Sequence, residues 1–382
     1  MPQYRKDPLT GRWVIVAEER AERPHQFDIE TTDDDTPKEY CPFCPGNEAR
    51  TPPELDAIRP PGSAANASDW AVRVVPNQYP AVTPNEEFPD QHTFQTRFGD
   101  ILDVDTPLAA LGAPFYQPLP GIGTHEVIID TPRHVLCLTD LSDAEVVNVF
   151  RIYQRRLQAI AAEKRYASAM IFKNVGAAAG ASLPHAHSQL LAMPLVAPPI
   201  QRELHRAIEF RRETNRCYWC EHIRHEIKHA ARFVEQTDHF VTLCPYVSRF
   251  PGEIAIFPKH HESHFERLPE RHVDELALLV RRAVKTLCKT TPWIKGRLSY
   301  NMILKSGPFV YLGPLDSRDM HDLSAVWLKK VDYAFENVYH FHVTILPSLA
   351  KAAGFEWGCG LHINPVSPET AAAKLREHLK DV

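Results

Sequence analysis

A series of short motifs occurs twice, in the same order, within this chain of 382 residues. Each copy begins with a Cys-x-x-Cys pair, continues with an apolar segment closed by a Pro/His turn, and ends with His-x-His in a second apolar run. The middle histidine precedes an asparagine by 40 residues in both copies, His134 before Asn174 and His261 before Asn301. Such regular recurrence indicates a duplicated unit. Because each copy mixes strand-like and helix-like patterns, we predict an α+β fold, an antiparallel sheet with helices, built from two tandem, pseudo-duplicated halves.

The same spacings set the boundaries of the halves. We place them at residues 1–196 and 197–382, because the motifs start again after Pro198-Pro199. In the first half 11 residues separate Asn174 from His185, whereas 39 separate Asn301 from His340. The second half therefore carries an insertion, at about residues 306–337.

Each half also contains one amphipathic helix after its middle histidine. Ser142 begins the first helix, with Glu145 three residues later in a capping box. The second helix begins near Pro269, and apolar residues recur at helical spacing in both.

Two thiols and two imidazoles from each half form a donor set typical of a closed structural zinc site. Cys-x-x-Cys alone also fits a redox pair, but no thioredoxin-like pattern surrounds either pair. His260 could replace His261 in the second set, and unrelated thiols are the alternative for both sets. We predict zinc, one site in each half, with iron as an alternative ion for the second. The first set is Cys41, Cys44, His134 and His185; the second is Cys217, Cys220, His261 and His340.

His187 is left free when the first histidine of each His-x-His is assigned to metal. In a strand, His185, His187 and Gln189 would share one face, so a metal-held histidine would lie beside a free imidazole and an amide. A free imidazole can attack phosphorus, and an amide can bind a phosphoryl oxygen. The alternative is a pair of surface histidines on an edge strand.

A loop of small residues leads into His187, and its counterpart His342 has none. The loop runs from Asn174 to Ser182, and its exposed N–H groups could hold phosphate. We therefore interpret the first half as catalytic and the second as a copy kept for structure and for part of the substrate pocket.

Bulk composition excludes several classes of function. The net charge of −5 does not favour a nucleic-acid binding protein. The sequence contains no run of about 18 apolar residues, so it predicts no membrane span. Its first residues lack the apolar core of a signal peptide. Eight cysteines beside 20 histidines favour metal sites over disulfides. We expect a cytoplasmic protein with no nucleic-acid or membrane partner.

The stretch Asn174-x-Gly-x-x-x-Gly180-x-Ser182-x-Pro-His185-x-His187-x-Gln189 resembles the active-site signature of hexose-1-phosphate uridylyltransferases. These enzymes form the galactose-1-phosphate uridylyltransferase branch of the histidine-triad superfamily, so each half would be histidine-triad-like. Most of the chain carries the resemblance. Further matching segments are Asp7-Pro-Leu-Thr-Gly-Arg-Trp-Val, Arg20-Ala-Glu-Arg23-Pro, Cys41-Pro-Phe-Cys44-Pro-Gly, Arg73-Val-Val-Pro-Asn77 and Gly354-Phe-Glu356.

The resemblance implies ping-pong transfer of a nucleoside monophosphate between a nucleotide-sugar and a hexose 1-phosphate, with UMP as the first candidate for the nucleotide. His187 would be the nucleophile and form a nucleotidyl-histidine, with Gln189 on a phosphoryl oxygen. Such enzymes are usually homodimers in which residues of one subunit reach the partner's sugar phosphate. By resemblance, Asn174, Gly180 and Ser182 would line the phosphates, Asn77 the nucleoside, Arg20 and Arg23 the partner's sugar phosphate, and Glu356 the hexose hydroxyls.

Departures from the pattern leave the substrate open. By count, His362 occupies the second sugar-binding position, where the galactose enzymes usually have glutamine. Related branches with two cysteine pairs act as ADP-sugar phosphorylases or adenylyltransferases, which is the first alternative. A dinucleoside-polyphosphate phosphorylase or nucleotide hydrolase is the second, although Gln189 stands where such hydrolases more often have histidine. A zinc-stabilised binding module without activity is the third.

Overall fold

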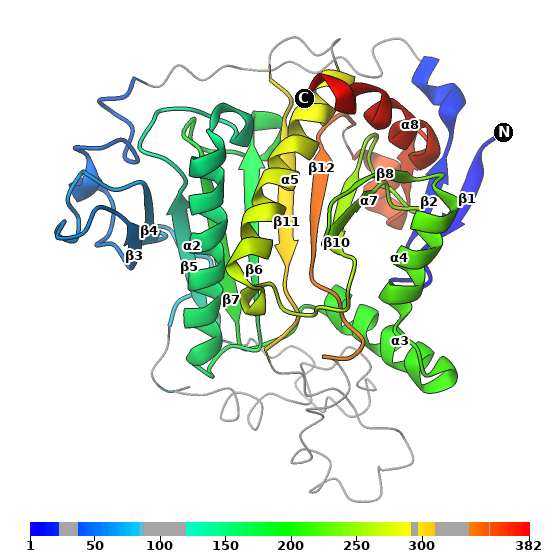
Figure 1. Cartoon of the computed structure of the whole chain (residues 1–382), viewed down its shortest axis with the longest axis horizontal. Helices are drawn as coiled ribbons and strands as arrows, with labels where there is room; N and C mark the ends of the chain where they lie inside the picture. Colours follow the sequence, from blue (N-terminus) through cyan, green and yellow to red (C-terminus); the bar gives the residue numbers. More distant parts are fainter. Residues whose placement is uncertain (23–36, 85–86, 88–119, 292–296, 310–335, 351) are drawn as a thin grey trace, which may run out of the picture.

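The computed structural model describes residues 1–22, 37–84, 87, 120–291, 297–309, 336–350 and 352–382. Arg23 and most of the predicted insertion, residues 310–335, lie outside these ranges. One antiparallel sheet of ten strands dominates the fold (Figure 1). Its strands, in spatial order, are β3 (Asp56–Ile58), β4 (Val72–Pro76), β5 (Thr124–Ile129), β7 (His187–Met193), β6 (Ser168–Val175), β11 (Tyr300–Lys305), β12 (His342–Pro347), β10 (Ile254–Pro258), β9 (Phe240–Leu243) and β8 (Phe233–Gln236).

The strand order on one side of β6 and β11 mirrors the order on the other side. Asn174 of β6 pairs directly with Asn301 of β11 where the halves join. The two asparagines are not structural counterparts, because Phe172 pairs with Gln189 as Ile303 pairs with Thr344, which makes Lys305 the counterpart of Asn174. The predicted α+β fold with two pseudo-duplicated halves is confirmed. The boundary between residues 196 and 197 stays a prediction, and the sheet is continuous between the halves.

Two long helices cover one face of the sheet, α2 (Asp143–Ala162) and α5 (Glu270–Thr290) (Figure 1). The capping box predicted at the start of α2 is present: Glu145 N–H donates to Ser142 Oγ, and Ser142 N–H donates to Glu145 Oε2 at 2.7 Å. An N-cap of this kind stabilises a helix by about 1 kcal/mol. The helices pack on each other and on the sheet through fully buried apolar residues, including Val149, Phe150 and Val280.

The opposite face of the sheet carries both cysteine/histidine sets, with a separate group of buried apolar residues beside each. In the second half, α3 (Pro198–Thr214) and α4 (Tyr218–His229) lie on this side. Within the described ranges, no helix combines the length and the apolarity that crossing a lipid bilayer requires.

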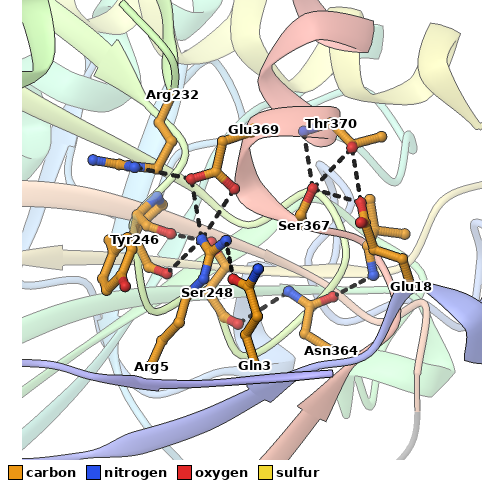
Figure 2. A network of polar contacts seen from close by, with 12 residues as sticks. Gln3, Arg5, Glu18, Arg232, Tyr246, Ser248, Asn364, Ser367, Glu369 and Thr370 are labelled. Carbon is orange, nitrogen blue, oxygen red and sulfur yellow. Dashed lines mark hydrogen bonds and ion pairs between the residues drawn. The ribbon is translucent and has the colours of Figure 1, made fainter. Parts of the chain in front are cut away.

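A second sheet of three strands joins the two ends of the chain: β1 (Gln3–Lys6), β2 (Trp13–Val16) and β13 (His362–Asn364). Figure 2 shows how polar side chains fix it. Arg5 Nη1 lies 3.0 Å from a carboxylate oxygen of Glu369 in α8 (Pro368–His378), and its guanidinium lies 4.6 Å from the centre of the Tyr246 ring. Asn364 Nδ2 donates to Ser248 O at 3.0 Å. These contacts hold His362 and the preceding α7 (Gly354–Cys359) at the β8 end of the large sheet.

Candidate functional site

His187 is the first residue of β7, and its repeat mate His342 is the first residue of β12. The strand predicted to run through His185 therefore begins two residues later. Pro184 precedes His185 and has no N–H to donate to a ladder, which favours an irregular segment there. His185 is still held beside the sheet, because Ala186 N–H donates to Val135 O at 2.6 Å.

The structure brings Cys41, Cys44, His134 and His185 together, with their ligand atoms all within 4.8 Å of one another. Cys44 Sγ lies 3.2 Å from His134 Nδ1, and Cys41 Sγ lies 3.5 Å from His185 Nδ1. His185 Nε2–H donates to Thr131 O at 2.9 Å, which leaves Nδ1 unprotonated toward the cysteines. This group could hold a metal ion.

The protonation of these residues fits a bound cation. Burial lowers the pKa of His185 to about 4, so the ring is neutral, as a ligand must be. Burial, and after it the neighbouring Cys41, raises the pKa of Cys44 to about 12, so this thiol is neutral at pH 7 and becomes a thiolate only when a bound cation lowers that pKa. Two thiolates this close and this buried need a positive ion between them, and two sulfurs with two imidazole nitrogens match tetrahedral zinc.

Cys217, Cys220, His261 and His340 form a second group of the same kind. Cys220 Sγ lies 3.3 Å from His340 Nε2, and the latter lies 3.0 Å from His261 Nδ1. A hydrogen bond from Cys220 is the main reason that the pKa of Cys217 falls to about 7. His261 rather than His260 is the histidine that the structure places in this group. Metal binding by both groups stays a prediction.

The His187 ring lies beside the first group without belonging to it. Its Nδ1–H donates to His185 O at 2.7 Å, so the proton is on Nδ1 and the lone pair is on Nε2. Burial, followed by the nearby Lys173, lowers the pKa of His187, which keeps the ring neutral at pH 7. The Phe43 ring, from the Cys-x-x-Cys segment, packs edge-on against it with centroids 5.2 Å apart. A neutral, oriented imidazole with a free lone pair can act as a nucleophile.

Gln189 is oriented by a residue that the sequence analysis missed, His125 at the start of β5. His125 Nδ1 accepts a hydrogen bond from Ala81 N–H at 3.1 Å, so the ring proton is on Nε2. This Nε2–H donates to Gln189 Oε1 at 2.8 Å. The Gln189 NH₂ group is therefore left to face a ligand oxygen. Asn77 Nδ2 lies 3.2 Å from the same His125 nitrogen, so the structure brings these three residues together.

The small-residue loop follows β6 and contains a single short turn, η5 (Ala177–Ala179). Asn301 was used above only to mark the repeat, yet its Nδ2 donates to Asn174 Oδ1 and to Ala179 O, each at 2.8 Å. The second half thus holds the loop of the first. Gly180 and Ser182 lie at the open end of this loop, with no atom within 4 Å of a Cβ at Gly180 and Ser182 exposed.

The residues predicted to bind the sugar and the partner's sugar phosphate lie elsewhere in the chain. Arg20 lies in η1 (Glu18–Glu22), Glu356 in α7 and His362 in β13. Figure 1 shows α7 near the β8 end of the large sheet, away from β7. Burial, then Arg249 and Arg12, lowers the pKa of His362.

The second half differs from the first around the equivalent histidine. His342 Nδ1–H donates to His340 O at 3.1 Å, as in the first half, and burial lowers its pKa to about 3. The rings of Trp219 and Phe257 pack on it at centroid distances of 5.5 and 5.3 Å. A cavity of about 910 Å³ adjoins this cluster.

Comparisons with known proteins agree with this architecture. The family model for the N-terminal domain of galactose-1-phosphate uridyl transferase matches residues 1–197. An ADP-glucose phosphorylase of Arabidopsis thaliana is 32% identical over 377 residues, which cover 98% of this chain and 93% of that protein. A galactose-1-phosphate uridylyltransferase of Thermotoga maritima is 25% identical over 383 residues, 99% of this chain and 98% of that protein. The crystal structure of an Arabidopsis ADP-glucose phosphorylase with bound ADP-glucose superimposes with a TM-score of 0.72 and 30% identity, covering 99% of both chains.

Proposed function

Because the chain belongs to the galactose-1-phosphate uridyl transferase family of nucleotide-transferring enzymes, we propose that it transfers a nucleoside monophosphate through a covalent intermediate on His187. The observation that carries the proposal is the state of that ring: outside the cysteine/histidine group, neutral, and with its lone pair on Nε2. A metal-bound or protonated imidazole could not attack phosphorus.

The reaction would run in two displacements. His187 Nε2 attacks the α-phosphorus of a nucleoside diphosphate sugar; an N–P bond forms, and the P–O bond to the sugar phosphate breaks. An oxygen of the acceptor phosphate then attacks the same phosphorus, and the N–P bond breaks. Imidazole suits both steps, since it is a good nucleophile and a good leaving group near neutral pH.

The remaining site residues would stabilise the charge that builds on the phosphoryl oxygens. Gln189 presents its NH₂ group because His125 holds its oxygen. Asn174, Gly180 and Ser182, in the small-residue loop, would line the substrate phosphates. The two cysteine/histidine groups would hold zinc as a structural cross-link. In the first half, Cys41, Cys44, His134 and His185 then fix the backbone next to His187.

The choice of nucleoside is the finer part of the proposal. The motifs led us to expect UMP, with UDP-glucose and a hexose 1-phosphate as substrates. The 32% identity to an ADP-glucose phosphorylase, against 25% to the Thermotoga uridylyltransferase, supports AMP transfer from an ADP-sugar to phosphate instead. We favour the adenylyl donor and keep the uridylyl donor as the second candidate.

Covalent labelling decides between these candidates. The protein is incubated with ADP-glucose or UDP-glucose labelled in the α-phosphate, and protein-bound label is counted after denaturation. We expect label from the ADP-sugar, lost in His187→Gln and retained in the matched repeat variant His342→Gln. Label from the uridine donor alone would select the second candidate. A folded His187→Gln protein that labels like wild type would remove the proposed nucleophile.

The proposal includes a homodimer in which Arg20, Arg23, Glu356 and His362 complete the partner's site. Mixed dimers test it. Co-expressed His187→Gln and Glu356→Gln chains should regain roughly a quarter of wild-type activity, because half of random dimers are mixed and each holds one complete site. No recovery would place Glu356 in the site of its own chain, whereas full activity of the Glu356→Gln protein alone would place it outside catalysis.

A further inference from the structure

A buried ion pair lies behind the strand that carries His187. Lys173 Nζ of β6 is 2.7 Å from Asp130 Oδ2, directly after β5, and both side chains are fully buried. Ser188 Oγ donates to Asp130 Oδ1 at 3.1 Å, and the Tyr153 hydroxyl is hydrogen-bonded to Ser188 Oγ. We call these four residues the Asp130 network. The two displacements proposed above use none of them.

The network reaches the backbone of His187. Lys173 Nζ donates a second hydrogen bond, 2.9 Å long, to the carbonyl oxygen of His187. Asp130 N–H donates to Ala186 O at 3.0 Å, and hydrogen bonds alternate along an antiparallel ladder, so the carbonyl of His187 points away from β5 and toward β6. The ladder between β6 and β7 ends at the pair Phe172–Gln189. The lysine therefore supplies the donor that the neighbouring strand does not.

The second half shows the same strand pair without this gap. There the ladder between β11 and β12 continues through Leu304–Val343 to Lys305–His342. The two strands of the first half thus separate at the residue proposed to react, whereas the corresponding strands of the second half stay paired. Separation opens one side of the β7 backbone next to the small-residue loop.

Apolar residues occupy the equivalent positions in the second half. Val343 stands in place of Ser188, after the second histidine. Leu304 stands in place of Lys173, because Leu304 pairs with Val343 in the same way that Lys173 lies beside Ser188. Ile256 pairs with Val343, so Phe257 lies opposite His342, just as Ile129 lies opposite His187. The next residue is Pro258 in the second half and Asp130 in the first, so Pro258 stands in place of Asp130.

The duplication is therefore an internal control for the role of the network. The second half forms the same strand with a fully apolar set, so this strand can fold without a buried ion pair. Apolar residues of similar volume are often as stabilising as a buried ion pair, or more so. Stability of the fold does not explain why the charged set occurs behind His187.

We propose that the Asp130 network is a positioning device for His187, resting on the nucleotidyl-transfer function proposed above. β6 and β7 separate to give the substrate phosphates access to the loop, and Lys173 replaces the lost ladder contact. The Nδ1 contact to His185 O orients the ring, while Lys173 fixes the backbone from which the ring projects. Together the two contacts fix the position of Nε2 relative to the α-phosphorus. A misplacement of about 1 Å can slow such a reaction roughly 100-fold.

The test uses a double variant, because Lys173→Met alone would leave a buried carboxylate without a partner. Lys173→Met/Asp130→Asn removes both charges and keeps an acceptor for Ser188. The matched control is Arg151→Met/Asp274→Asn, which removes a bidentate pair at 2.7–2.8 Å between the outer surfaces of α2 and α5. Ser188→Ala is a second variant that introduces no unpaired buried charge, in case the double variant does not fold.

Two measurements are made on each protein: the single-turnover rate of protein labelling over a range of donor concentrations, and hydrogen–deuterium exchange of the backbone. We expect the double variant to label roughly 10- to 100-fold more slowly at saturating donor, with half-saturation within about 3-fold of wild type. Exchange at 187–189 should rise about tenfold, while 342–344 should match wild type. Ser188→Ala should slow labelling and speed exchange at 187–189 by roughly 3- to 10-fold. The surface control should match wild type in both measurements.

The outcomes separate this inference from the proposed function. Wild-type labelling rates in a folded double variant, or unchanged exchange at 187–189, would overturn the positioning role. Failure of wild-type protein to accept label from any nucleotide sugar would overturn the proposed function. In that case the exchange data would still decide whether the network holds the strand.

Discussion

Two glycines flank the turn of the small-residue loop, and replacing each by alanine separates two physical effects. Gly176 has φ +82° and ψ 153°, a region open almost only to glycine. A Cβ there would lie 2.1 Å from Ser299 Oγ and 2.9 Å from Ser299 Cβ. Gly180 has φ +82° and ψ 20°, the left-handed region, with no atom within 4 Å of a Cβ.

The expected free energies follow from these surroundings. Backbone strain in Gly176→Ala costs about 1–3 kcal/mol. Overlap with Ser299 adds about 1–3 kcal/mol. Gly180→Ala carries only the left-handed penalty, about 1–2 kcal/mol. Adding Ser299→Gly to Gly176→Ala removes the overlap but not the strain, so it should restore about 1–3 kcal/mol.

Urea unfolding of the four proteins measures these differences, and donor half-saturation measures the effect on the phosphate loop. We expect Gly176→Ala to raise the half-saturating concentration, because a shifted loop misplaces its N–H groups. The reasoning is refuted if Gly176→Ala is no more destabilising than Gly180→Ala. It is also refuted if Ser299→Gly restores nothing in the double variant.

Three further predictions concern other parts of the molecule. Cys44→Ser should lower the melting temperature and the zinc content measured by atomic absorption, whereas the exposed Cys359→Ser should change neither. His125→Phe should slow labelling about 10-fold with little change in stability, because Gln189 Oε1 loses its donor; a wild-type rate would show that Gln189 needs no fixed orientation. Arg133 is the main cause that the pKa of Glu145 falls to about 2. A depressed carboxyl pKa stabilises the fold above its unfolded value, so Arg133→Gln should be destabilising at pH 7 and neutral near pH 2; an equal loss at both pH values in urea titrations would contradict this.

The grouping of the cysteines and histidines could be predicted from the sequence because they are rare residues in short motifs. Cys-x-x-Cys and His-x-His bring chemically distinct atoms close together whatever the exact strand bounds are. His187 stood out because only one histidine of each pair is needed for a four-donor set. The structure places both groups of four as the motifs predicted.

Contacts that depend on strand register could not be predicted in this way. His125 orients Gln189 because β5 and β7 pair with Thr124 opposite Ala192, and nothing within either segment fixes that alignment. Asp130 follows β5 and Lys173 lies near the end of β6, positions where a charge is usually assumed to face solvent. In the fold the two side chains are instead fully buried and paired with each other.

The contact from Asn301 to the small-residue loop adds a role for the second half that the sequence did not predict. The sequence suggested a copy kept for structure and for part of the substrate pocket. In the fold, its β11 lies beside β6, and the Asn301 side chain bonds both Asn174 and Ala179 at 2.8 Å. The loop that would hold the substrate phosphates is therefore tied to the other half by hydrogen bonds that a single half cannot make. A first half alone would expose the edge of β6 and lose these bonds, so the duplication supports the first half at its small-residue loop as well as in its core.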